Sequence, residues 1–147
     1  MSDYGYALED LEIGMSASFA KTITDADILM FAGVSGDTNP VHLNEEFAGA
    51  TPFKGRIAHG MLTASLISTA LGTKLPGAGC VYLSQTMKFL APVRAGETVR
   101  AVVTVKEIEQ EKRRVTLDTI CRVGGHDVMI GEAKLVIPAR AASQPVT

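Results

Sequence analysis

Hydrophobic and polar residues alternate through most of the second half of the chain. In residues 98–108, for example, Val99 and Ala101 fall on one face and Arg100 falls on the other. An alternation with a period of two residues is typical of a half-buried β-strand. The strands that this pattern predicts are 17–24, 81–90, 98–108, 113–124 and 127–138.

A different spacing predicts helices in the first half. Thr24 and Asp27 form a capping box at the start of residues 25–36, where hydrophobic residues recur every three or four positions. Asn44 is a suitable cap for one short helical turn further along. Residues 60–73 carry no charged side chain, and a helix that is apolar nearly all round is predicted to be buried.

Together these elements predict an α+β fold. One buried helix, one earlier strand and four consecutive antiparallel strands imply a five-stranded sheet that curls round the helix. The hot-dog fold has this arrangement, although the pattern also allows other α+β sandwiches. In the strand over 81–90, four apolar side chains share one face, and these are Val81, Leu83, Met87 and Phe89.

Length and composition narrow the possible functions. The 147 residues suit one domain over 1–147, with a structured core over 10–138 and a flexible tail over 139–147. A formal net charge of −2 gives no basic excess, so we expect no nucleic-acid partner. Cys80 and Cys121 lack the spacing of a disulfide framework or a zinc site, so we expect two small core residues and no metal.

The N-terminal sequence indicates the cellular compartment in which the protein is expected. It carries early acidic residues and no apolar h-region, so it does not predict a signal peptide. No hydrophobic run approaches the roughly 20 residues that span a bilayer. We therefore expect a cytoplasmic protein with no membrane partner.

The stretch SGDTNPVH at 35–42 combines a turn with two ionisable side chains. A surface turn would explain Asp37, Asn39 and Pro40, because Asx side chains bond nearby backbone and proline fixes φ. That interpretation leaves His42 unexplained. Across a rigid bend, the carboxylate of Asp37 and the imidazole of His42 could hold one water between two proton acceptors, as general acid–base catalysis requires.

The stretch RIAHGM, at the start of the predicted buried helix, is the second candidate. The free N–H groups of a first helical turn, together with the helix dipole, can stabilise a developing negative oxygen. Glycine at position 60 would let a ligand approach that backbone closely, although Gly60 could also serve only the turn. We interpret His59 as a hydrogen-bonded loop histidine.

Two further polar residues lie among apolar neighbours. Gln85 is on the apolar face of its predicted strand, so its amide must bond either a buried loop or a substrate. Ser68 lies two turns into the predicted buried helix. It could bond the carbonyl of Ala64, or it could orient a catalytic carboxylate.

Three stretches, in this order, resemble the MaoC-like (R)-specific enoyl-CoA hydratases of the hot-dog fold. They are FAGVSGDTNPVHLNEEFA at 31–48, IAHGMLTASLIS at 57–68 and YLSQTMKFLAPVRAGETV at 82–99. The resemblance covers roughly residues 10–138. Its signature, D-x-N-P-x-H followed by A-H-G, is specific to the hydratase and dehydratase branch of the fold.

The resemblance implies roles for particular residues. Asp37 and His42 match the catalytic pair of the family, and Gly60 matches the residue whose N–H polarises the thioester carbonyl. Ser68 matches a serine near the catalytic aspartate. Gln85 keeps both of its alternatives, an internal bond or a substrate contact.

The resemblance also implies an activity. We expect reversible addition of water to a trans-2-enoyl-CoA, giving (R)-3-hydroxyacyl-CoA, in fatty acid metabolism or the supply of polyhydroxyalkanoate precursors. No cofactor is expected, since CoA is part of the substrate. A homodimer is expected, because open sheet edges are normally covered. The alternatives are a 3-hydroxyacyl-ACP dehydratase, a hydratase for branched or dicarboxylic acyl-CoAs, and a non-enzymatic acyl-thioester-binding module.

Overall fold

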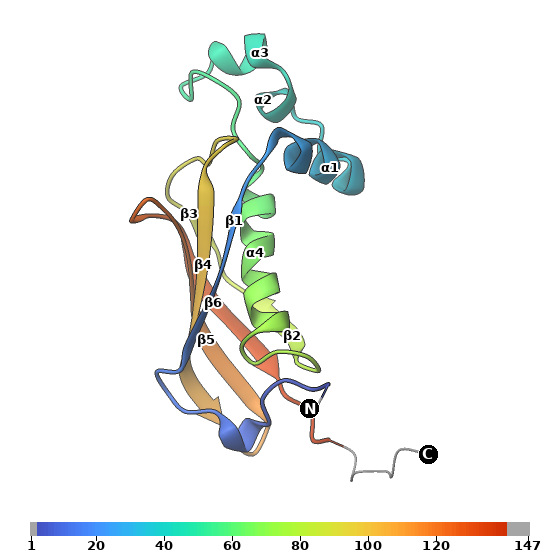
Figure 1. The fold of residues 1–147 in the computed structure, drawn as a ribbon, viewed down its shortest axis with the longest axis vertical. Helices are drawn as coiled ribbons and strands as arrows, with labels where there is room; N and C mark the ends of the chain where they lie inside the picture. The colour runs from blue at the N-terminus through green and yellow to red at the C-terminus, as the bar shows by residue number, and fades with distance from the viewer. Residues whose placement is uncertain (1–2, 141–147) are drawn as a thin grey trace.

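The computed structural model describes residues 3–140 (Figure 1). After a 3₁₀ turn at Leu8–Asp10, the helices are α1 (Asp25–Ser35), α2 (Pro40–Leu43), α3 (Glu45–Gly49) and α4 (Gly60–Thr73). The strands are β1 (Ser16–Thr22), β2 (Val81–Gln85), β3 (Lys88–Phe89), β4 (Thr98–Glu109), β5 (Arg114–Val123) and β6 (His126–Val136). Beyond Arg140, the predicted flexible tail lies outside the described residues.

The strands form one antiparallel sheet in the order β1-β4-β5-β6-β2, with β3 paired to β6. Val105 pairs with Leu117, and Leu117 pairs with Ala133, so the apolar faces of β4, β5 and β6 lie in register. All three of these side chains are at most 1% exposed. The alternation predicted for these strands is therefore confirmed.

Helix α4 runs along one face of this sheet (Figure 1), with contacts to β1, β4 and β5. Leu66, Ile67 and Leu71 on α4 join the main hydrophobic core with the inward residues of the strands. The expected α+β hot-dog architecture, a sheet wrapped along a central helix, is confirmed. Helices α1, α2 and α3 gather at the end of the molecule where α4 begins (Figure 1).

The prediction that α4 is buried all round is wrong for a single chain. Its sheet-facing residues are buried, but Met61 is 52% exposed and Ser68 is also exposed. The reason is geometric, because a single sheet covers one side of the helix only. The opposite side of α4 is uncovered within the described residues.

The strand predicted over 81–90 is two strands. β2 ends at Gln85 and β3 starts at Lys88, because Thr86 leaves the strand direction to lie against Gly131 of β6. A Cβ atom at Gly131 would lie 1.8 Å from the Thr86 carbonyl oxygen, so this approach requires glycine. The sheet consequently has six strands where five were expected.

The position of β2 in the sheet also departs from chain order. It pairs with β6, the last strand, and so forms an edge of the sheet. A β-bulge between Tyr82 and Ser84 breaks the simple alternation of β2. The apolar face predicted for this segment is largely uncovered, with Val81 47% and Phe89 50% exposed.

Within residues 3–140, none of the helices combines the length and the apolar character needed to cross a membrane.

Candidate active site

Asp37 follows the C-terminal end of α1 and is the first residue of the candidate site along the chain. Thr24 and Asp27 form the predicted capping box at the first turn of α1, and Gly36 ends the helix in the left-handed conformation (φ 77°). The hydroxyl of Ser35 then accepts a hydrogen bond from the Asp37 amide at 3.1 Å. One carboxylate oxygen of Asp37 accepts from the Asn39 amide at 3.2 Å, so the carboxylate also forms the Asx turn.

His42 lies on the short helix α2. The bend expected from the sequence is one helical turn, because the Asn39 side chain caps it and Pro40 occupies its first position. His42 is 8% exposed, and its Nδ1 lies 2.8 Å from the carbonyl oxygen of Ile57. A carbonyl only accepts, so Nδ1 carries the proton and Nε2 keeps a lone pair.

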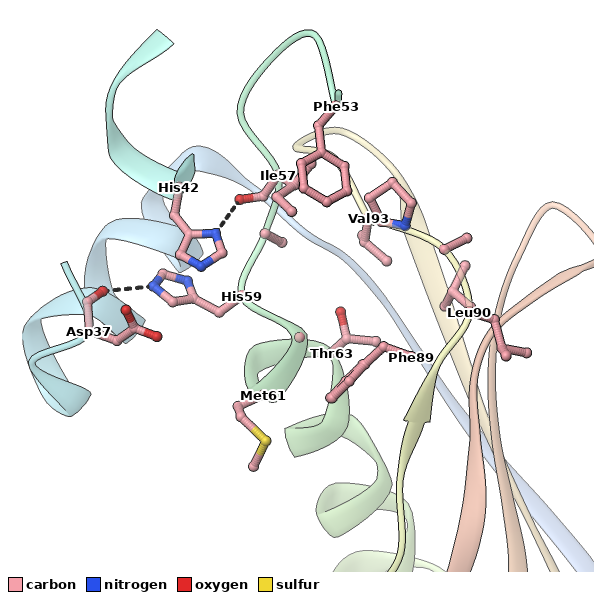
Figure 2. A pocket seen from close by; sticks show the side chains of 15 residues that line it. Asp37, His42, Phe53, Ile57, His59, Met61, Thr63, Phe89, Leu90 and Val93 are labelled. Atoms are coloured by element: carbon pink, nitrogen blue, oxygen red, sulfur yellow. Dashed lines mark hydrogen bonds between the residues drawn. The ribbon is translucent and has the colours of Figure 1, made fainter. Parts of the chain in front are cut away.

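His59 joins these two residues, as Figure 2 shows. Its Nε2 donates to the main-chain carbonyl of Asp37 at 2.9 Å, and its ring stacks on that of His42 with centroids 3.9 Å apart. One ligand atom each of Asp37, His42 and His59 lies within 4.8 Å of the others. Sequence reasoning gave His59 no role in the site, although its position beside Gly60 in the A-H-G motif was a usable signal.

The first turn of α4 borders the same site. Leu62 and Thr63 donate to the carbonyl of His59, whereas the amides of Gly60 and Met61 bond no backbone carbonyl within residues 3–140. A helix N-terminus with free amides favours a negative oxygen. A Cβ at Gly60 would lie 2.8 Å from the ring of Phe89, so any larger residue here would have to displace this ring.

A cavity of about 410 Å³ connects these groups (Figure 2). It is lined by Asp37, His42, His59 and Gly60 at one end. Its remaining wall is largely apolar, and includes Phe53, Ile57, Phe89, Leu90, Val93 and Val128. The arrangement brings a carboxylate and an imidazole together in one wall of a largely apolar cavity, next to the first turn of α4.

Residues 10–123 match the family model of the MaoC like domain. The chain belongs to the MaoC-like domain family. This confirms the resemblance inferred from the sequence.

Three similar proteins place the MaoC-like chain within that family. It is 56% identical to an (R)-specific enoyl-CoA hydratase of Rhodospirillum rubrum over 132 residues, which cover 90% of this chain and 92% of the relative. It is 49% identical to a 3-hydroxybutyryl-CoA dehydratase of Methylorubrum extorquens, with 94% and 88% covered. A solved (R)-hydratase from A. caviae involved in PHA biosynthesis superposes with a TM-score of 0.85 at 41% identity, covering 88% of this chain and 99% of that one.

Ser68 and Gln85 do not line the cavity that contains Asp37 and His42 in this MaoC-like chain. Both line a second, mainly apolar groove along the uncovered side of α4, which meets the first cavity at Met61. Within one chain, Ser68 is therefore not placed beside Asp37. The orienting role of Ser68 stays a prediction.

The amide of Gln85 has internal partners. Its Nε2 donates to the hydroxyl of Thr119 at 2.9 Å and to the carbonyl of Thr86 at 2.8 Å, and its Oε1 accepts from the Tyr82 hydroxyl. Of the two alternatives for Gln85, these bonds favour the internal one. Burial raises the pKa of Tyr82 to about 12, so this hydroxyl stays protonated and donates.

The two cysteines of the MaoC-like chain lie outside the catalytic cavity. Cys121 is fully buried in the core, and burial raises the pKa of its thiol to about 12. Cys80 is half-buried, and burial raises its pKa as well. Neither thiol is an activated nucleophile, since activation requires a lowered pKa.

The carboxylate of Asp37 and the imidazoles of His42 and His59 lie close enough together to be considered as ligands of one metal ion. Each imidazole has one nitrogen committed to a main-chain carbonyl and one free. Metal ions bind imidazole through the in-plane lone pair of nitrogen. Because the rings of His42 and His59 stack 3.9 Å apart with only 30° between their planes, an ion in the plane of one ring lies well out of the plane of the other. This geometry suits a shared metal ion poorly, so the absence of a metal stays our prediction.

Proposed function

We propose that this protein is an (R)-specific enoyl-CoA hydratase that adds water reversibly to trans-2-enoyl-CoA. The observation that carries the proposal is the fixed tautomer of His42. Its Nδ1–H donates to the Ile57 carbonyl, so in the neutral ring Nε2 keeps its lone pair close to the Asp37 carboxylate, and both residues line the largely apolar cavity. A neutral imidazole and a carboxylate are two proton acceptors for one water.

The proposed reaction begins with that water. Its oxygen attacks the β-carbon of the enoyl thioester and forms a C–O bond, while one water proton passes to the pair of Asp37 and His42. The π electrons of the double bond move toward the thioester oxygen. Which of the two residues takes the first proton is a property of the coupled pair rather than of either residue alone.

The first turn of α4 stabilises the resulting enolate. The amide of Gly60 donates to the negative oxygen, assisted by the helix dipole and by the dry, apolar wall that Phe89 and Val93 provide. The catalytic pair then returns one proton to the α-carbon on the same face. Water is thus added as H and OH with no change of oxidation state at the enzyme, so the proposed chemistry needs no redox cofactor, and the Gly60 amide supplies the polarisation of the thioester oxygen that a metal would otherwise provide.

The proposal is tested by mixing the purified protein with crotonyl-CoA. We expect the absorbance of the conjugated thioester to fall, and chiral chromatography to identify (R)-3-hydroxybutyrate after hydrolysis of the product. Crotonyl-ACP serves as the second substrate, and we expect slower turnover with it. Binding of crotonyl-CoA without turnover would favour the non-enzymatic alternative, and an (S) product would contradict the proposed geometry.

We also propose that the protein is a cytoplasmic homodimer. The uncovered side of α4 and the edge strand β2 expose apolar side chains next to each other, including Met61 at 52% and Leu83 at 47%. Edge strands and contiguous apolar surface are normally covered by a partner. Light scattering at micromolar concentration is expected to give twice the chain mass. A monomer mass would contradict the dimer without affecting the hydratase proposal.

A further inference from the structure

His59 has an unusual environment for a histidine that takes no part in proton transfer. It is 1% exposed, and its ring contacts two other rings, those of His42 (3.9 Å between centroids) and Phe31 (4.8 Å). It also forms the N-cap of α4 without making a side-chain capping bond. Its side chain is therefore directed at the catalytic loop rather than at its own helix.

The hydrogen bonds of His59 fix its tautomer. Because Nε2 lies 2.9 Å from the main-chain carbonyl of Asp37, Nε2 carries the proton. In the neutral ring, Nδ1 is then a lone pair. Nδ1 is also the one buried side-chain nitrogen or oxygen without a hydrogen-bond partner in the part of the chain that the structure describes.

An unpaired buried nitrogen costs free energy, so a side chain chosen only to fill this space would be apolar. Phenylalanine would keep the contacts with Phe31 and His42 and leave no nitrogen unpaired. Only a side chain with a hydrogen-bond donor can make the bond to the main-chain carbonyl of Asp37 at this position. We infer that His59 is a positioning residue, whose Nε2–H holds the backbone of Asp37 at a fixed separation from His42.

This arrangement ties both catalytic groups to one side chain. The ring face of His59 sets the position of the His42 imidazole, and its N–H sets the position of the Asp37 backbone, as the close-up in Figure 2 shows. A water shared by Asp37 and His42 requires that both groups are held at the correct position at the same time. A displacement of about 1 Å between reacting groups can cost about 100-fold in rate.

The inference rests on the proposed hydratase activity and is tested with two variants that separate the donor from the ring. His59→Gln places an amide N–H at the same number of bonds from the backbone as Nε2, but lacks the ring. His59→Phe keeps the ring and loses the donor. We expect His59→Phe to lower kcat with crotonyl-CoA by about 10- to 100-fold at little cost in KM. His59→Gln should recover most of the wild-type kcat.

A role in packing predicts the opposite order, with His59→Phe active and His59→Gln impaired. If the wild-type protein is active and the variants show this opposite order, the inference about His59 is wrong and the proposed function is unaffected. An inactive wild-type protein would instead overturn the proposed function. His126, an exposed histidine at the start of β6, provides the control, and His126→Gln is expected to leave kcat unchanged.

A second measurement needs no variant at the site and so does not depend on whether His59→Phe folds. The chain has three histidines, and His126→Gln assigns one of them in ¹⁵N spectra of the imidazoles. At pH 8 we expect His42 as the Nδ1–H tautomer and His59 as the Nε2–H tautomer. Nδ1–H tautomers at both of the two remaining histidines would show that His59 does not donate to Asp37, and would overturn the inference.

Discussion

The inner face of the sheet and the cluster of loops at the start of α4 are held together in different ways. On the sheet, side chains such as Val103 and Leu117 are completely buried and hold each other by packing. In the loop cluster, defined here as residues 36–44 and 51–59, side chains are held by main-chain groups, as His42 is held by the carbonyl of Ile57.

This difference separates stability from chemistry. Apolar side chains on β4, β5 and β6 make up almost half of the residues of the buried core, and that core includes none of the ionisable groups of the site. The loop cluster buries little apolar surface but contains Asp37, His42 and His59. Substitutions in the loop cluster should therefore change the rate with little change in stability, whereas substitutions in the sheet should do the reverse.

The largest effect is expected from Asp37 and His42, the proposed catalytic pair. Asp37→Asn keeps an oxygen that can accept the bond from Asn39 and removes the charge, whereas His42→Ala removes the imidazole. Each variant should lose about 10²–10⁴-fold in kcat with crotonyl-CoA. Because both groups hold one water, the double variant should lose far less than the product of the two single losses.

The matching measurement for these three variants is thermal unfolding. Melting temperatures close to the wild-type value would agree with a role in chemistry. Near-normal turnover combined with a clearly lower melting temperature would mean that Asp37 and His42 serve only the turn.

A smaller loss of rate is expected at the start of α4. Gly60→Val brings a branched side chain against the ring of Phe89 and obstructs the free amides, so kcat should fall by about 10²–10³-fold. Phe89 is 50% exposed and can move aside, so the fold should survive. Phe89→Leu is the control, because it alters the same contact without a Cβ at position 60. A soluble, cooperatively melting and nearly fully active Gly60→Val protein would refute the oxyanion role.

The sheet should behave in the opposite way. Leu117 is 0% exposed at the centre of β5, and Leu117→Ala leaves a cavity there. The free energy of unfolding, measured in urea, should fall by about 2–5 kcal/mol. Turnover per folded molecule should change little. A large loss of turnover in molecules shown to be folded would contradict the separation of the two regions.

The smallest expected effect concerns Asp27, at the first turn of α1. The hydrogen bonds from Lys21 and from the Thr24 amide hold the pKa of Asp27 below its ordinary value of 3.8. A carboxyl whose pKa is lowered by folding stabilises the fold above the unfolded pKa, and this contribution is lost as the pH falls through the folded value.

Asp27→Asn should therefore lower the free energy of unfolding at pH 7 by at most about 1 kcal/mol. The difference from the wild type should shrink as the pH is lowered below 3.8, which thermal melts over a pH series would measure. A difference that is equally large at pH 7 and in acid would mean that the charge of Asp27 contributes nothing.

The regular parts of the fold could be predicted from the sequence because they follow local rules. The two-residue period of β4 and β5, the capping box at Thr24 and the apolar run of α4 each identify an element from neighbouring residues alone. The break between β2 and β3 could not be predicted this way. It depends on Gly131, more than 40 residues along the chain, which admits the Thr86 carbonyl.

The residues of the candidate site can likewise be divided into those that the sequence could predict and those that it could not. Asp37, His42 and Gly60 could be selected because their residue types and order form a motif, and the structure places all three around one cavity. The A-H-G motif could have singled out His59, but its partner could not be predicted, since that partner is a main-chain carbonyl 22 residues away. The sequence also could not show that Ser68 lies on the side of α4 that its own sheet leaves uncovered.

The two ring N–H groups of the site both donate to main-chain oxygens, those of Ile57 and Asp37. Every amino acid carries that oxygen, so exchange of the Ile57 side chain leaves the bond to His42 intact. Alanine scanning through residues 51–58 would therefore leave the Ile57 carbonyl in place, and this carbonyl selects the tautomer of His42. Insertion or deletion of one residue in that segment would shift the oxygen out of reach. The length of this segment, more than its composition, should therefore be what natural variation preserves.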